Sequence, residues 1–292
     1  LLFMQRLNEQ FNGKLSLAIE IFQNKHPKQF LHQLVSSQLD MDRLDYLKRD
    51  SFFTGVTEGN IGAERIINML DIVDNKLVVE EKGIYSIEKF LIARRLMYWQ
   101  VYLHKTVVSA ENMLIKVLQR AKELLNDGKE VYTNPYLGEF LKNNYTINDF
   151  KNNTKLLNDF AELDDFDIYS SLKYWKNNPD FVLSSLSKMI LNRKLLKIKV
   201  KNTAFTASEI EIETDKFKQS HNTTKQEVEY FIFSDKISNS TYNIEKANIN
   251  ILMKNGYVID IASASDQFNI EALKKTTSKY FLCYPKLKQS AL

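Results

Sequence analysis

The chain of 292 residues is 44% hydrophobic and 26% charged, which is the composition of an ordinary globular protein with enough length for two domains. A net charge of +4 falls short of the dense basic stripe of a nucleic-acid binder, so no nucleic-acid partner is expected. The single cysteine, Cys283, excludes an intramolecular disulfide and a Cys-based zinc site. Because no run approaches the roughly 20 apolar residues of a membrane span, we expect no membrane association and a cytoplasmic location.

The N-terminal half is dominated by helical spacing of apolar residues. The first residues, LLFMQRLNEQF, fit an amphipathic helix that has no N-cap before it, so we expect the chain to be the later part of a longer protein. Helical spacing continues to about residue 195, with one exception at 69–81. There Asp74 and Asn75 separate two apolar runs and predict a hairpin.

The longest helix is expected from an N-cap at Ser86 to about Leu125. At 100° per residue, one stripe of this helix is predicted to be core: Ile92, Leu96, Trp99, Leu103, Val107, Ala110 and Leu114. A second stripe on another side is polar and aromatic: Arg94, Tyr98, Tyr102 and Lys105. This helix is therefore expected to present a functional face beside its buried one.

The pattern changes after residue 195. Two or three helices are expected within 145–192, and from Leu195 onward near-alternating runs rich in Ile, Val, Tyr and Phe predict strands. Asn255-Gly256 predicts a hairpin, and helices are expected near 207–221 and 268–278. The predicted fold is mostly α with a C-terminal α+β subdomain, divided as a helical core at 1–126, a helical extension at 127–195 and a small α+β domain at 196–292.

One predicted helix, at 38–50, concentrates charge on one side. A helical wheel puts Leu44 and Leu47 opposite a face formed by Asp42, Asp45, Tyr46, Arg49 and Asp50. Such a face can be an ordinary solvated one with i, i+4 pairs such as Asp45 and Arg49. The flanking runs FLHQLV and SFFTGV are apolar, however, so we expect the helix to lie in the interior, where carboxylates need a metal or an arginine.

The motif DMDRLDYLKRDSFFTG at 40–55 resembles the signature helix of the HD-domain deoxynucleoside triphosphate triphosphohydrolases, a family that includes the human sterile-alpha-motif and HD-domain protein and many bacterial relatives. ARRLMYWQVYLHK at 93–105 is similar to the family's second substrate helix. ISNSTYN at 237–243 and DIASASDQFNI at 260–270 resemble the bacterial branch. The resemblance implies the C-terminal part of an HD-domain helical core and a phosphohydrolase that converts a dNTP to deoxynucleoside and triphosphate.

The resemblance also implies site residues, carried over position by position. Asp42 would be the catalytic carboxylate that closes a divalent metal site, and Arg43 and Arg94 would bind the triphosphate. Tyr46 would lie near the phosphates. Asp50 would accept a hydrogen bond from the sugar 3′-hydroxyl, and Tyr102 would pack against the sugar or the base. The metal, whether Mg, Mn, Fe or Zn, is not distinguished.

The sequence departs from the family at its other metal ligands. The family uses a His and a His-Asp dipeptide, but this sequence has no His-Asp dipeptide, and none of its histidines has a partner at ligand spacing: His26, His32, His104 and His221. We therefore expect the remaining ligands upstream of Leu1, and a chain that is inactive alone. A homo-oligomer, dimer or tetramer, is also implied.

Two alternatives remain open. The chain could be a non-catalytic nucleotide-binding module that controls regulation or oligomerisation, or part of an HD phosphohydrolase that acts on another nucleotide.

Overall fold

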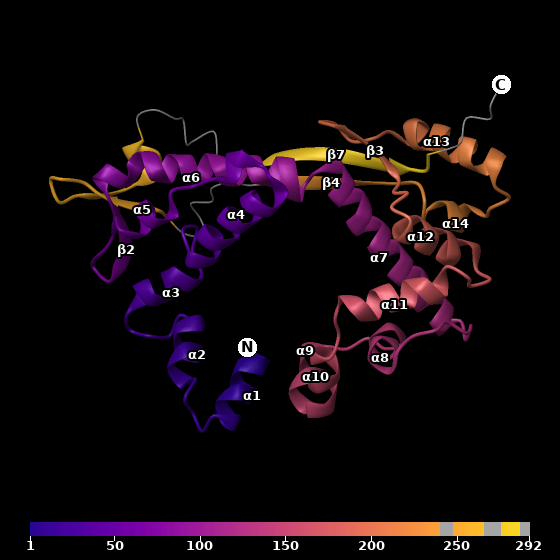
Figure 1. Cartoon of the computed structure of the whole chain (residues 1–292), viewed down its shortest axis with the longest axis horizontal. Helices are drawn as coiled ribbons and strands as arrows, with labels where there is room; N and C mark the ends of the chain where they lie inside the picture. The colour runs from indigo at the N-terminus through magenta and orange to yellow at the C-terminus, as the bar shows by residue number, and fades with distance from the viewer. Residues whose placement is uncertain (240–247, 266–275, 287–292) are drawn as a thin grey trace. The chain divides into compact units, whose positions relative to one another are not determined.

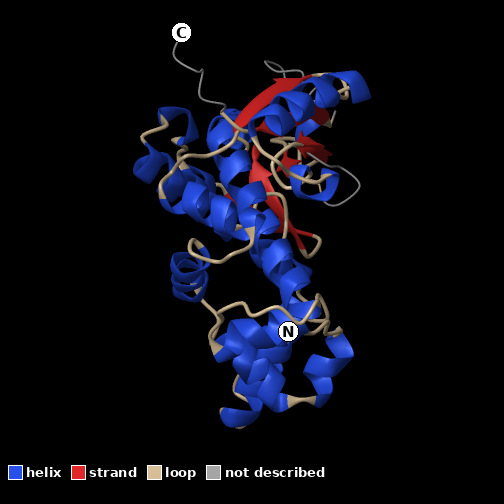
Figure 2. Ribbon diagram, turned by 90° about the vertical axis from the view of Figure 1, so that its right-hand side faces the viewer, coloured by secondary structure: helices blue, strands red, loops and turns tan. Residues whose placement is uncertain are grey.

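The computed structural model of the chain describes residues 1–239, 248–265 and 276–286. Helices occupy most of these residues, and the strands form two small sheets (Figure 2). The expected class, mostly α with a C-terminal α+β part, is confirmed. No helix in the described ranges combines the length and the apolar composition needed to cross a bilayer.

The chain forms two compact units, and each is described by itself. The first contains Leu1–His104 and Ser238–Ser278, and the second contains Lys105–Ile237 and Lys279–Leu292. The predicted division into 1–126, 127–195 and 196–292 stays a prediction. Strands from the C-terminal region complete the sheet that begins at residue 70, and they therefore belong to the first unit.

The first unit combines helices with a four-stranded sheet (Figure 1). Its elements are α1 (Leu2–Gln10), α2 (Ser16–Phe22), α3 (Gln29–Val35), α4 (Met41–Thr54), η1 (Thr57–Gly59), α5 (Ala63–Ile67), β1 (Leu70–Val73), β2 (Lys76–Glu80), η2 (Glu81–Gly83), α6 (Ile84–Met97), η3 (Tyr98–Tyr102), β5 (Asn250–Leu252), β6 (Val258–Asp260) and α15 (Ile261–Ala264).

Both predicted hairpins are present in this sheet, whose order is β1-β2-β5-β6. Asp74 and Asn75 adopt positive φ of 49° and 64° in the β1–β2 turn, as a two-residue hairpin turn requires. The second hairpin joins β5 to β6, and Gly256 there has φ of 87°. β5 pairs with β2 in parallel, with Val79 opposite Ile251.

Helices α4 and α6 form the core of the first unit. Leu44 and Leu47 of α4 are buried with Phe90 and Leu91 of α6. Gly59 lets η1 approach both helices, because a Cβ at this position would lie 2.9 Å from Ser51 Cβ on α4 and 2.5 Å from Met97 Sδ on α6. By contrast, α1, α2 and α3 bury none of their residues.

The prediction of one long helix from Ser86 to about Leu125 is wrong. α6 begins at Ile84 and ends at Met97, the π-helical turn η3 follows, and a new helix begins at Lys105. The expected core stripe fails with it: Val107 is 43% exposed, and Trp99 and Leu103 are only partly buried. A wheel assumes 100° per residue throughout, but the wider π turn and the break at His104 reset the phase for the residues that follow. Before the turn, α6 buries Phe90, Leu91 and Met97, which leaves Ile92 and Leu96 only partly buried.

The second unit is built around the helix that follows this break. Its elements are α7 (Lys105–Asn126), α8 (Pro135–Lys142), α9 (Ile147–Asn152), α10 (Thr154–Ala161), α11 (Asp165–Trp175), α12 (Phe181–Leu191), β3 (Lys197–Lys201), α13 (Ala207–Ser220), α14 (Lys225–Val228), and most of β4 (Phe233–Asn239) and β7 (Thr277–Tyr284).

The second unit packs α7 against α12, and its core includes Met113, Val117, Leu183 and Leu186. A three-stranded sheet has the order β3-β7-β4. The helix predicted near 207–221 is present as α13, which begins at the capping box of Thr206 and Glu209. Of the helix predicted at 268–278, residues 268–275 lie outside the described residues, whereas Thr277 and Ser278 begin β7.

A partly buried ion pair ties α7 to the N-terminus of α12. Arg120 Nη2 lies 2.6 Å from Asp180 Oδ2, and Arg120 Nε donates to Asp180 Oδ1 at 3.1 Å. The same carboxylate accepts from the backbone N–H of Leu183 and so caps α12. Burial raises the pKa of Asp180, but the hydrogen bonds from Arg120 and Leu183 outweigh burial and hold this pKa below its ordinary value.

We expect Asp180→Ala to lower the free energy of unfolding by about 3 kcal/mol at pH 7, because it removes both the ion pair and the cap. Asp180→Asn keeps a capping side chain and should cost less. Since the folded pKa of Asp180 is lowered, its charge stabilises the fold above the unfolded pKa of about 4, and this contribution is lost as pH falls through the folded value. Urea unfolding of the wild type and of Asp180→Asn from about pH 3 to about pH 7 measures this contribution to the free energy of unfolding.

The control for this prediction is Asp45→Ala, which removes an exposed i, i+4 pair with Arg49. Its expected cost is below about 0.5 kcal/mol. Equal losses for Asp180→Ala and Asp45→Ala would contradict the assigned role of Asp180.

Candidate functional site

The charged motif forms α4, and its first carboxylate is structural. Asp40 is buried at the N-cap, where its Oδ1 accepts from the backbone N–H of Arg43 at 2.8 Å. The Nε of Arg43 lies 3.2 Å from Asp40 Oδ2 and donates to the Ser37 carbonyl at 2.9 Å. Asp40 therefore both starts the helix and holds the Arg43 side chain.

The expectation that this helix lies in the interior is wrong for its charged face. Asp42 and Asp45 are exposed, and Asp45 pairs with Arg49 at 2.7 Å. The flanking Phe52 and Phe53, which suggested burial, are 80% and 78% exposed. An apolar flank does not reveal which way each side chain points, and here only the opposite face, with Leu44 and Leu47, is buried.

Further along α4, the predicted site residues come together with residues of α6 and η3. Tyr102 donates its hydroxyl to Asp50 Oδ2 at 2.6 Å. The Tyr46 and Tyr102 rings meet edge to face, with centroids 6.1 Å apart. Asp50, Tyr46 and Tyr102 thus form one cluster, although Tyr102 follows Asp50 by 52 residues in the sequence.

Tyr98 links this cluster to Arg94, and the predicted site residues did not include it. The Tyr98 ring centroid lies 5.2 Å from that of Tyr102, and the Arg94 guanidinium carbon lies 5.8 Å from the Tyr98 centroid. The sequence did place Tyr98 on the polar-aromatic stripe with Arg94 and Tyr102, and this position could have identified it as a site residue. The π turn carries both tyrosines, and the Leu103 N–H closes it by donating to the Tyr98 carbonyl at 2.7 Å.

Electrostatics keep the two phenols of the cluster protonated. Burial and the neighbouring Tyr98 raise the pKa of Tyr46, against the smaller opposing effect of Arg94 and Arg43. Burial and the hydrogen bond to Asp50 raise the pKa of Tyr102 well above its ordinary value. At neutral pH the cluster therefore offers hydroxyl donors, guanidinium cations from Arg43 and Arg94, and one carboxylate.

A metal ion is not supported by the described residues alone. Within these ranges no group of three or more His, Cys, Asp or Glu is placed to hold one. The Asp42 side chain makes no hydrogen bond or ion pair with any other described residue. Two of the histidines contact the fold instead: His32 Nδ1 lies 3.0 Å from the Ile21 carbonyl, and His221 stacks on Phe217. One carboxylate does not make a tight divalent site.

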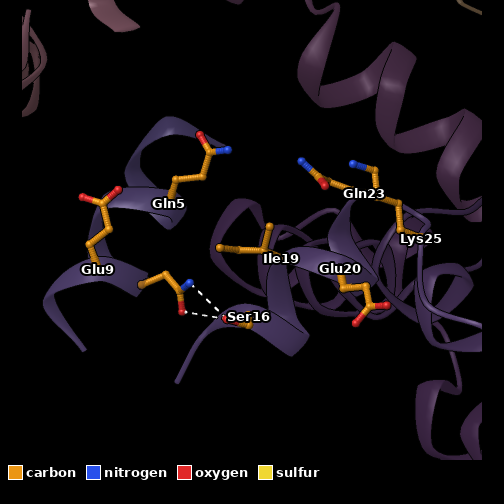
Figure 3. Close-up of a pocket in the computed structure, with 8 residues that line it drawn as sticks. Gln5, Glu9, Ser16, Ile19, Glu20, Gln23 and Lys25 are labelled. Atoms are coloured by element: carbon orange, nitrogen blue, oxygen red, sulfur yellow. Dashed lines mark hydrogen bonds between the residues drawn. The ribbon is translucent and has the colours of Figure 1, made fainter. Parts of the chain in front are cut away.

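A solvent-open pocket of about 540 Å³ lies elsewhere, between α1 and α2 (Figure 3). Its lining is polar apart from Ile19, and Asn8 donates to Ser16 Oγ at 3.1 Å across it. None of the predicted site residues lines this pocket, so it gives no support to the site.

Comparison with known proteins assigns the chain to a family. Residues 61–133, which include Arg94, Tyr98 and Tyr102, match the HD associated region. The crystal structure of a phosphohydrolase from Bacteroides thetaiotaomicron is 51% identical and superposes with a TM-score of 0.92, covering 97% of this chain and 70% of that one. The chain belongs to the HD-domain phosphohydrolases.

Two further relatives are less similar in sequence. The uncharacterized protein YwfO of Bacillus subtilis is 30% identical over 91% of this chain, which spans 60% of that protein. A deoxynucleoside triphosphate triphosphohydrolase SAMHD1 homolog of Dictyostelium discoideum is 26% identical over 125 residues, which are 41% of this chain and 24% of that protein. The chain thus spans 60% or less of the length of these two relatives.

Proposed function

We propose that the complete protein hydrolyses a dNTP to deoxynucleoside and triphosphate, and that the cluster on α4, α6 and η3 binds the nucleotide. The observation that carries this proposal is the convergence of Arg94, Tyr98 and Tyr102 with Tyr46 and Asp50. The name of the Dictyostelium relative supports the choice of substrate.

Each group in the cluster suits one part of such a ligand. Arg43 and Arg94 can bind phosphate oxygens through charge-assisted, bidentate hydrogen bonds. Asp50 accepts from Tyr102 on one oxygen, and a carboxylate has further lone pairs with which to accept from a sugar hydroxyl. The aromatic rings of Tyr98 and Tyr102 offer a flat apolar surface to a sugar or base.

The divalent metal expected for the family would need ligands beyond those described here. Asp42 is the carboxylate that we propose as one of them, since it is exposed and unpaired among the described residues. In this proposal, the chain binds and orients the nucleotide. Turnover of dNTP, NTP and nucleoside monophosphate by the complete protein tests the substrate class: preference for dNTP supports the proposal, and preference for a monophosphate contradicts it.

A second candidate is a regulatory nucleotide-binding module without catalysis, since the cluster of Arg94, Tyr98 and Tyr102 can bind a nucleotide whether or not it is hydrolysed. The two candidates separate in the complete protein. The regulatory candidate predicts that dNTP changes the assembled mass without being consumed, and the hydrolase predicts release of triphosphate.

We expect Tyr102→Phe to weaken dNTP binding about tenfold, because Asp50 then loses the donor that orients it. Affinity for inorganic triphosphate should stay unchanged, since the lost hydroxyl faces the proposed sugar site. Isothermal titration with dGTP and with triphosphate measures both affinities. Tyr85→Phe is the matched control, because Tyr85 lies on α6 with a 55% exposed side chain; equal effects of both variants would refute the assigned contact.

A further inference from the structure

Exposed aromatic side chains occur on α11, on the first turn of α8 and on the segment that leads into α8, in the second unit. Five of them leave more than a third of their surface in solvent: Tyr132 (44%), Tyr136 (38%), Phe166 (81%), Tyr169 (56%) and Tyr174 (56%). A monomeric protein rarely exposes such a concentration of apolar surface without a binding role. We call this group the α11 surface.

The centre of the α11 surface is one face of α11. Phe166, Tyr169 and Lys173 follow i, i+3, i+7 spacing, so they lie on the same side of α11. The opposite side buries Leu172 and Trp175, and the Trp175 indole donates to the Tyr132 carbonyl at 2.7 Å. The core of the unit therefore holds α11 in place with its aromatic face outward.

Part of this surface is already ordered for binding. The rings of Tyr132 and Tyr174 stack with centroids 3.7 Å apart and an interplanar angle of 21°. Side chains that are held before association lose less conformational entropy when a partner covers them. Tyr and Phe are also the residues enriched at the centres of protein interfaces.

The charges that flank the aromatic face are self-complementary. Exposed Asp165 is the first residue of α11, and exposed Glu162 precedes the helix by three residues. At the other end, exposed Lys173 lies in the last turn and exposed Lys176 follows the last residue of the helix. Within the described residues none of these four forms an ion pair. If two copies of α11 lie antiparallel, the acidic end of each faces the basic end of the other, which is the pattern that a two-fold symmetric interface requires.

We propose that the α11 surface binds a second copy of this chain, with the two α11 helices antiparallel about a two-fold axis. Phe166 and Tyr169 form the apolar centre of this interface. Asp165 of each copy faces Lys173 or Lys176 of the other. This interface does not depend on the proposed nucleotide site, so an experiment that contradicts the interface does not contradict nucleotide binding.

Sedimentation velocity of the 292-residue chain over a concentration series tests the apolar centre. We expect a dimer, and Phe166→Ser and Tyr169→Ser should each raise its dissociation constant at least about tenfold. Phe53→Ser is the matched control, because Phe53 is 78% exposed on α4 in the other unit. A wild-type chain that stays monomeric, or equal effects of Phe166→Ser and Phe53→Ser, overturns the proposal.

A reciprocal charge reversal tests the antiparallel arrangement. One variant combines Lys173→Glu and Lys176→Glu, and the other combines Glu162→Lys and Asp165→Lys. Each alone places like charges opposite one another and should be monomeric, whereas an equimolar mixture should recover the dimer. Circular dichroism shows that each variant is folded. Failure of the folded mixture to associate, with the wild type dimeric, overturns the arrangement.

Discussion

Arg94→Ala is expected to weaken dNTP binding by the chain about a hundredfold, the loss that follows when about 3 kcal/mol of charge-assisted hydrogen bonding to phosphate disappears. Arg94 is buried on α6, and its guanidinium is fixed over the Tyr98 ring. Because the cation is held before the ligand arrives, little side-chain entropy is lost on binding. Isothermal titration with dGTP measures the affinity.

The control for this prediction is the neighbouring residue of the same helix. Arg95 donates to Thr277 Oγ1 at 3.4 Å and takes no part in the tyrosine cluster, so Arg95→Ala should leave the affinity within about twofold. Arg94→Lys keeps the charge but loses the bidentate geometry, and we expect an intermediate loss of about tenfold. If Arg95→Ala weakens binding as much as Arg94→Ala while both remain folded, the binding site lies elsewhere.

The second large effect concerns catalysis. We expect the 292-residue chain to release no triphosphate from dGTP above the buffer background in either Mg²⁺ or Mn²⁺. The reason is that its described residues hold no three-ligand group, and a lone carboxylate binds a divalent cation weakly. Chromatographic detection of deoxyguanosine and triphosphate measures this. Turnover by the pure chain would contradict the prediction.

The same prediction extends to a longer form of the protein that carries the upstream His and His-Asp ligands expected from the family resemblance. There Asp42→Ala should abolish hydrolysis and lower the bound metal measured by elemental analysis. Asp45→Ala should change neither, because Asp45 lies one turn away from that position and pairs only with Arg49. Loss of activity without loss of metal would show that Asp42 acts in another way.

Much of the local structure was predictable because it depends on neighbours in sequence. Asp74-Asn75 and Asn255-Gly256 specify their hairpins through the positive φ that Asp, Asn and Gly tolerate. α13 begins at a capping box that is legible in the sequence. The charged motif forms a helix with Leu44 and Leu47 on its buried side, as its spacing indicates.

Other features were decided only by tertiary structure. The π turn at Tyr98–Tyr102 ends α6 and resets the phase of the following helix, although the apolar spacing continues across it. β5 joins β2 in the first unit, and this pairing joins residues 172 positions apart, as with Val79 and Ile251, which no local pattern specifies. The exposure of Phe52 and Phe53 likewise depends on what packs against α4.

The candidate site combines both kinds of information. The site residues at 42–50 and 94–102 were carried over from the family resemblance, and the helical stripe already placed Tyr98 between Arg94 and Tyr102. The meeting of the two segments, however, needed the packing of α6 on α4. Helix caps, turns and amphipathic faces are short-range properties, so sequence determines them directly. Contacts between distant segments depend on the balance of all the surfaces buried together, and only the folded chain shows which of them are made.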